Sequence, residues 1–86
     1  MSATVSKAAF FKALGDEVRL RIVKELLRRK RCTCICELAK VAGRDQSVIF
    51  RHVKLLETAG IINTHNEGRY LMCCVKEPRR ISRLLE

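Results

Sequence analysis

Three cysteines that alternate with other residues near the middle of the chain are the side chains best suited to chemistry. Cys32, Cys34 and Cys36 form a Cys-x-Cys-x-Cys run, and in an extended segment residues two apart point to the same side. A neighbouring helix N-terminus would lower the pKa of their thiols. Three converging thiolates suit a trigonal metalloid such as As(III), whereas Zn²⁺ would want a fourth ligand. We therefore predict a site for As(III) or another thiophilic metal, with no cofactor required.

Two other roles for these cysteines remain open. The run could sense redox state by forming a disulfide, or one or two of its members could be small core residues. Cys73 and Cys74 follow on a predicted strand, where neighbours point to opposite faces, so at most one is expected to be buried. An odd total of five cysteines argues against the disulfide scaffold of a secreted protein, although intracellular proteins of hyperthermophiles do carry disulfides.

A second group of functional candidates lies on one face of a helix predicted over residues 45–59. Its apolar arc, at about 100° per residue, should pack into the core; we place on it Val48, Ile49, Val53, Leu55, Leu56 and Ala59. The opposite arc carries hydrogen-bonding groups, two cations and an aromatic ring, namely Ser47, Phe50, Arg51, Lys54 and Thr58. Such a surface suits a DNA groove.

Individual DNA contacts follow from the side-chain types on this helix. Gln46 and Ser47 fall in its first turn, which usually meets base edges in a recognition helix. Gln46 suits adenine, Arg51 suits guanine or phosphate, and Phe50 suits a thymine methyl. Further candidates are Lys54, His52, Arg44 for a phosphate at the preceding turn, and Arg69 for the minor groove or a phosphate. Two alternatives remain open: a structural, hydrogen-bonded His52, and a Phe50 packed on a neighbouring element.

The remaining elements must present this helix. Apolar spacing predicts helices over 1–14, from Asp16 to about residue 30, and over 37–42, with Gly43 before the recognition helix. Two helices joined by a short glycine-containing turn are typical of a helix-turn-helix. Asp45 should cap the recognition helix through its side chain, and Gly60 should end it. β-prone segments at 61–65 and 70–75, joined by a turn at 66–69, predict a hairpin wing, and a last helix should follow Pro78.

Composition limits the class of protein and its partners. The 86 residues suit a single domain, 1–86, with a thin core that dimerisation would help. A formal net charge of +9 favours a polyanion or an anionic surface as partner. No long apolar run or signal-like start is present, so we expect a cytoplasmic protein that does not enter a membrane.

With these residues placed, the chain resembles the ArsR/SmtB family of winged-helix repressors. The matching stretches are Ala13-Leu-Gly-Asp-Glu-Val-Arg-Leu-Arg-Ile-Val, Cys34-Ile-Cys-Glu-Leu-Ala, Gln46-Ser-Val-Ile-Phe-Arg-His-Val-Lys-Leu-Leu with Ala59-Gly60, and Glu67-Gly-Arg. The resemblance implies a mainly α, α+β winged helix-turn-helix fold with five helices and a two-stranded wing. It also implies a homodimer joined by its first and last helices. That dimer would repress by binding double-stranded DNA at an inverted-repeat operator, and a metal or metalloid would release it.

The chain departs from the family pattern at three places. Phe50 stands where family members commonly have a small residue, which affects the target sequence rather than the groove. Residues 77–86 lack the histidine- and aspartate-rich ligand set of zinc-sensing members, so a zinc site of that kind is not expected. In arsenic-sensing members a third ligand follows the pair that matches Cys34 and Cys36, whereas here Cys32 precedes the pair.

Competing functions come from other classes. A thiol-disulfide exchange enzyme would need a thioredoxin-like order of strands and helices around the cysteines, and the chain does not predict one. We therefore expect no enzyme. A redox-responsive regulator is one alternative; a winged helix that coats nucleoid DNA or contacts proteins without reading base sequence is the other.

Overall fold

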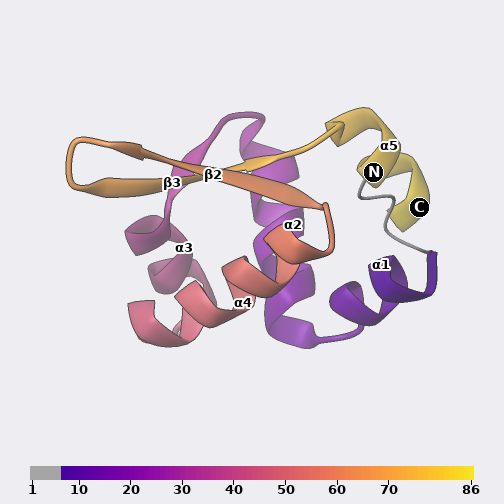
Figure 1. Ribbon diagram of the computed structural model, residues 1–86, viewed down its shortest axis with the longest axis horizontal. Coiled ribbons are helices and arrows are strands. Elements are labelled where there is room, and N and C mark those ends of the chain that lie inside the picture. The colour runs from indigo at the N-terminus through magenta and orange to yellow at the C-terminus, as the bar shows by residue number, and fades with distance from the viewer. Residues whose placement is uncertain (1–6) are drawn as a thin grey trace.

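Five helices and three short strands make up the part of the chain that the computed structural model describes, residues 7–86 (Figure 1). In chain order they are α1 (Lys7–Leu14), α2 (Glu17–Arg29), β1 (Thr33–Cys34), α3 (Ile35–Ala42), α4 (Gln46–Thr58), β2 (Ile62–Glu67), β3 (Tyr70–Val75) and α5 (Pro78–Leu85). The predicted winged helix-turn-helix with five helices is confirmed. The part of the first predicted helix that precedes Lys7 lies outside the described residues.

The start of α2 is fixed by its cap. Asp16 has extended backbone, and its carboxylate accepts bonds from the backbone N–H groups of Val18 at 2.9 Å and Arg19 at 3.1 Å. These bonds hold the pKa of Asp16 below its ordinary value, the bond from Arg19 first, because they stabilise the charged carboxylate. At the other end Lys30 adopts the left-handed conformation and its N–H bonds the carbonyl of Leu26. The predicted cap and the approximate end at residue 30 are confirmed.

The helix-turn-helix is formed by α3 and α4. Gly43 ends α3 at a positive φ of 64°, a conformation that glycine adopts without a steric penalty. Two details of the prediction are wrong. Helix α3 begins at Ile35, two residues early, so Cys36 lies in a helix rather than in an extended segment. Asp45 makes no side-chain bond to α4; instead its carbonyl accepts the N–H bonds of Val48 and Ile49 that hold the first turn.

The sheet is antiparallel in the order β1-β3-β2, and its hairpin β2–β3 is the wing. Glu67 pairs with Tyr70, so the connecting turn contains only Gly68 and Arg69 and is shorter than predicted. Gly68 supplies the positive φ of 62° that a two-residue turn of this kind requires. Strand β1 also pairs with β3, which places Thr33 opposite Cys73, and local sequence patterns do not predict this pairing.

A single core joins the helices to the sheet. The wing projects to one side of the molecule, and α1 and α5 lie at the other (Figure 1). The core residues with no measurable exposure come from α2, α4, the start of β2 with the residue before it, and β3, and they are Val23, Ile49, Val53, Leu56, Ile61, Ile62 and Cys73. In the described residues none of the helices has the length and apolar content that crossing a bilayer would need.

Candidate nucleic-acid interface

Helix α4 presents an outer face to solvent, which we define as Gln46, Ser47, Phe50, Arg51 and Lys54; all five side chains are exposed. Phe50 retains 43% of its surface, which is unusual for an aromatic residue in the middle of a helix. The alternative in which Phe50 packs on a neighbouring element therefore finds no support in the geometry of one chain. An exposed ring between polar groups leaves this face free to meet a partner.

The first turn of α4 and the wing enclose a shallow hollow of about 550 Å³. Its lining brings together Gln46, Ser47 and Phe50 from α4 with Arg69 from the wing turn. Asn66 of β2 lines the same hollow and was missed, because its position in the predicted turn suggested only a role in chain reversal. The candidates from the two elements thus form one surface, on which an amide, a hydroxyl, a ring and a guanidinium are available together.

Lys54 is partly engaged within the protein. Its Nζ donates to Glu57 Oε1 at 3.0 Å and lies 5.6 Å from the centre of the Phe50 ring. The second oxygen of Glu57 accepts the hydroxyl of Thr64 on β2 at 2.9 Å. The bond from Lys54 is the main reason why the pKa of Glu57 is lowered, followed by the bond from Thr64. Glu57 thereby connects the outer face to the wing.

The inner face of α4, which we define as Ile49, His52, Val53 and Leu56, points into the protein. His52 is half-buried, and its Nδ1 lies 3.2 Å from Arg19 Nη1. A guanidinium can only donate, so in this bond Nδ1 is the acceptor and the ring proton sits on Nε2. Arg19 is itself fixed by donating from Nε to the carbonyl of Ala13 at 2.6 Å. This geometry favours the structural role for His52 over a phosphate contact.

One residue was assigned to the wrong face of α4. Leu55 was placed on the apolar arc, but 49% of its surface is exposed. The reason is angular: Leu55 follows Val53 by two residues, or about 200° around the helix, which puts it beside Arg51 and outside the buried arc. Val48, also assigned to the core, is only half-buried. The buried arc of α4 is therefore narrower than predicted and includes His52.

Two arginines flank the outer face. Arg44 is exposed in the turn between α3 and α4, and Arg69 is exposed in the wing turn. The Arg69 guanidinium lies 5.8 Å from the ring centre of its neighbour Tyr70, which is itself 50% exposed. Neither arginine forms an ion pair with any residue in the range 7–86. Both cations are therefore available to a polyanion.

Four of the five cysteines form two disulfides, Cys32–Cys74 and Cys34–Cys36, and Cys73 is free. Because Thr33 pairs with Cys73 in an antiparallel register, Cys32 comes opposite Cys74, with their Cα atoms 4.4 Å apart. Cys34 and Cys36 bond across the first turn of α3. With its sulfur in that first bond, Cys32 is not grouped with Cys34 and Cys36. Within residues 7–86 there is no cluster of three or more free ligand side chains that would hold a metal ion.

The two cysteines of β3 differ in burial and in bonding, because Cys73 is a free thiol and Cys74 is in a disulfide. Cys73 is fully buried, and burial raises the pKa of its thiol to about 11, with the charge of Glu57 adding to the effect. The prediction that at most one of the pair is buried is confirmed. Cys74 is half-buried, and its sulfur lies 3.8 Å from Nδ1 of His65, whose Nε2 lies 2.8 Å from Glu67. His65 was missed because its contact, Cys74, lies across the hairpin rather than nearby in sequence.

Similarity to a known transcriptional regulator supports a regulatory role for the chain. The cadmium resistance transcriptional regulatory protein CadC of Listeria innocua is 30% identical over 73 residues, which are 85% of this chain and 60% of CadC. The chain therefore spans less than two thirds of that relative's length. The matched part is long enough to contain the helix-turn-helix and most of the sheet.

Solved structures show the same fold. HlyU from Vibrio cholerae superposes with a TM-score of 0.79 at 26% identity, over 91% of this chain and 82% of HlyU. The homodimeric winged helix-turn-helix domain of Mb0332 from Mycobacterium bovis also has a TM-score of 0.79, at 18% identity, over 99% of this chain and 86% of that domain. At 18% identity, the similarity to Mb0332 shows a shared fold and nothing more.

A sequence model of a protein family matches more than half of the chain. The model described as the bacterial regulatory protein, arsR family, matches residues 16–64, which run from the cap of α2 through the helix-turn-helix into the wing. The resemblance predicted from the motifs is thus confirmed, and the relatives are transcriptional regulators rather than enzymes. With more than half of its length matched, the chain belongs to the arsR family of bacterial regulatory proteins.

Proposed function

We propose that this protein is a sequence-specific DNA-binding repressor in which α4 enters the major groove and the wing contacts the flanking backbone. The observation that carries the proposal is the hollow shared by α4 and the wing turn, which joins Gln46, Ser47 and Phe50 to Arg69 on one exposed surface. The net charge of +9 favours a polyanion as partner. Family membership supports the same class of activity.

Each residue of this surface has a distinct role in the proposal. Gln46 pairs with adenine N6 and N7, Arg51 with guanine or a phosphate, and Phe50 lies on a thymine methyl. Ser47 bonds a base edge or a phosphate from the first turn. Lys54, Arg44 and Arg69 contact phosphates and supply affinity rather than sequence choice.

The proposed DNA-binding unit is a homodimer of single domains spanning residues 1–86, joined through α1 and α5. Phe11 on α1 is 49% exposed and Leu84 on α5 is 37% exposed, and both line a groove between the two helices. Exposed apolar groups of this size are expected where a partner covers them. The Mycobacterium bovis domain of the same fold is homodimeric. Two recognition helices about 34 Å apart would then meet successive major grooves of an inverted repeat.

A selection from random double-stranded oligonucleotides tests this proposal. We expect an inverted repeat to be enriched, and Gln46→Ala to relax the preference at one base pair per half-site while leaving affinity for unrelated DNA unchanged. Arg69→Ala should lower affinity for every sequence and reduce the salt slope by about one unit. Arg28→Ala, on the far end of α2, is the matched control. Uniform binding without an enriched repeat would instead support the nucleoid-coating alternative.

The two disulfides favour a redox response as a second function. The Cys32–Cys74 bond ties the residue before β1 to the strand that carries the wing, and the Cys34–Cys36 bond closes the first turn of α3. A cellular dithiol would reduce each bond by exchange, giving two cysteine thiols and one oxidised dithiol. Reduction would remove the covalent link between the segment that precedes α3 and the wing, and would leave only the β1–β3 pairing there. HlyU, which shares the fold, has been solved in a reduced form.

Mobility shifts with and without a dithiol test the redox response. We expect operator affinity of the wild type to differ at least about fivefold between the two states, and Cys74→Ser to remove the difference. Cys73→Ala, at a buried and unreactive thiol, is the control. Equal affinities in both states would refute the redox role.

The reduced protein also allows a test of the metalloid as inducer. Reduction frees Cys32, Cys34 and Cys36, and the related CadC is a cadmium resistance regulator. If these three thiols receive As(III), arsenite should release the reduced protein from its operator, and Cys34→Ser with Cys36→Ser should abolish the release. An unchanged release in that double variant would exclude this pair as the ligands.

A further inference from the structure

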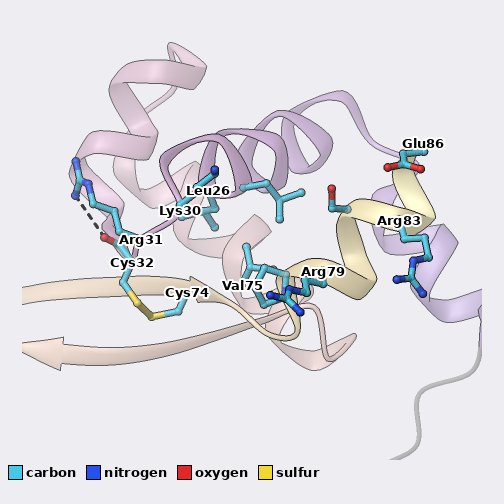
Figure 2. A pocket seen from close by; sticks show the side chains of 12 residues that line it. Leu26, Lys30, Arg31, Cys32, Cys74, Val75, Arg79, Arg83 and Glu86 are labelled. Carbon is cyan, nitrogen blue, oxygen red and sulfur yellow. Dashed lines mark hydrogen bonds between the residues drawn. A yellow bond between two sulfur atoms is a disulfide. The ribbon is translucent and has the colours of Figure 1, made fainter.

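A second surface with concentrated charge lies between α2, the end of β3 and α5. There the protein encloses a cavity of about 830 Å³, within the range of roughly 300–1,000 Å³ typical of small-ligand pockets. Helix α2 lies along one side of it, the sheet along another, and α5 closes the third, with the Cys32–Cys74 disulfide at one end (Figure 2). The cavity is thus larger than the hollow beside α4, and it has walls from three elements.

The floor of this α2–α5 cavity is apolar. Leu26 and Leu27 contribute from α2, Val75 from the end of β3 and Pro78 from the start of α5. Leu26 also belongs to the core, so this floor is held by the rest of the fold. Burial of apolar surface against such a floor would stabilise a bound hydrocarbon group.

The rim of the cavity is basic. Lys30, Arg31, Arg79 and Arg83 line it, against one acidic residue, Glu86. Arg79 and Arg83 are four residues apart on α5, so they share a face and repel one another. Arg31 is turned back toward the carbonyl of Cys32, at 3.5 Å (Figure 2). The other three cations are the ones free to meet a ligand.

These cations lack the partners that neighbouring cations have. Arg80, next to Arg79, pairs with Glu77 at 3.6 Å, and Arg29, next to Lys30, pairs with Glu25 at 2.6 Å. Across residues 7–86, by contrast, no ion pair involves any of the four basic residues at the rim. Several unpaired positive charges around an apolar floor attract an anion that also carries an apolar group.

DNA binding through α4 does not account for this cluster. Helix α5 lies at the opposite side of the molecule from the wing tip (Figure 1), and the hollow beside α4 shares no lining residue with the cavity. We propose that the α2–α5 cavity is a binding site for a small amphiphilic anion, with one carboxylate, sulfonate or phosphate on an apolar body. The anionic group meets Arg79 and Arg83 on α5, and the apolar body lies on Leu27, Val75 and Pro78. The proposal does not depend on the DNA-binding function.

Isothermal titration of the full chain with decanoate tests the proposal, and displacement of the fluorescent sulfonate 8-anilinonaphthalene-1-sulfonate gives a second readout. We expect saturable binding of one decanoate per chain. Decyltrimethylammonium, with the same chain length and the opposite charge, should not compete, and neither should acetate, which lacks the apolar body. Binding of the cation as tightly as decanoate, or no saturable binding, would overturn the proposal. All of these titrations use the wild-type chain.

Paired substitutions locate the site. Arg79→Gln with Arg83→Gln should weaken decanoate binding at least about tenfold, since two charge-assisted hydrogen bonds are lost. Lys24→Gln with Arg28→Gln removes the same charge outside the cavity and should change affinity less than about twofold. Circular dichroism establishes that both variants fold. Equal losses in the two pairs would show that net charge alone holds the ligand and would refute the assigned site.

Discussion

The two faces of α4 differ in how many of their side chains are buried or bonded to other groups of the same chain. On the inner face, Ile49, Val53 and Leu56 are fully buried and His52 is hydrogen-bonded to Arg19. On the outer face only Lys54 has an ion-pair partner among the described residues, Glu57. A helix whose inner groups are satisfied and whose outer groups are not is stable before it binds. Its outer residues are therefore open to selection for recognition without a cost in folding.

The largest effect should come from the centre of the inner face. Ile49→Ala removes a fully buried side chain and should lower the free energy of unfolding by about 2 to 5 kcal/mol. Urea denaturation followed by circular dichroism measures the change. Ile49→Val, which removes one methyl group, should cost only about 0.5 to 1.5 kcal/mol. If Ile49→Ala left stability unchanged, the assignment of the inner face would be wrong.

A smaller effect is expected at the α2 cap, which positions Arg19 against the inner face. Asp16→Ala should cost about 0.5 to 2 kcal/mol at neutral pH. Because the pKa of Asp16 is lowered on folding from an ordinary value of 3.8, its charge stabilises the fold above that value, and this contribution is lost as pH falls through the folded pKa. The difference between wild type and variant should therefore be constant above about pH 5 and shrink below about pH 4.

Asp16→Asn separates the hydrogen bonds of this cap from its charge. Asparagine is as good a cap as aspartate but does not titrate, so this variant should retain most of the stability at neutral pH and lose the acid dependence. Thermal unfolding at a series of pH values provides the measurement. An acid dependence that persists unchanged in Asp16→Asn would have to come from other carboxylates.

His52 tests whether the inner face contributes to recognition. His52→Ala should lower the free energy of unfolding by about 1 kcal/mol, because Arg19 loses an acceptor in a half-buried position. The affinity of the folded variant for its operator, and its salt slope, should not change. His52→Gln, which can still accept from Arg19, should recover part of the stability. A salt slope reduced by about one unit would instead indicate a phosphate contact.

The smallest effect on stability should come from the outer face. Phe50→Ala should change the free energy of unfolding by no more than about 0.5 kcal/mol, because the ring is exposed. Its effect should be on DNA, as a weaker preference for thymine over other pyrimidines at one position, measured with operator variants that carry thymine or uracil. A large loss of stability would show that the ring is covered, for example in a subunit contact.

The elements and their order follow from local sequence patterns, because apolar periodicity, caps and turn residues act over a few neighbouring positions. The Asp16 cap, the glycine turn before α4 and the hairpin could be read in this way, and so could the exposed candidates on α4. The errors at Leu55 and at the start of α3 were also local. The first came from assigning an angular position, the second from extending a strand-like pattern by two residues.

Which distant groups come together depends instead on how the strands pair and the helices pack in three dimensions. The register between β1 and β3 brings Cys32 to Cys74 across 42 positions of the chain and divides the cysteine run between two bonds. The packing of α4 on α2 places His52 in hydrogen-bonding distance of Arg19, and the fold of the hairpin places Arg69 and Gln46 around the same hollow. None of these contacts leaves a periodic signal, since each depends on strand register and helix packing rather than on local spacing.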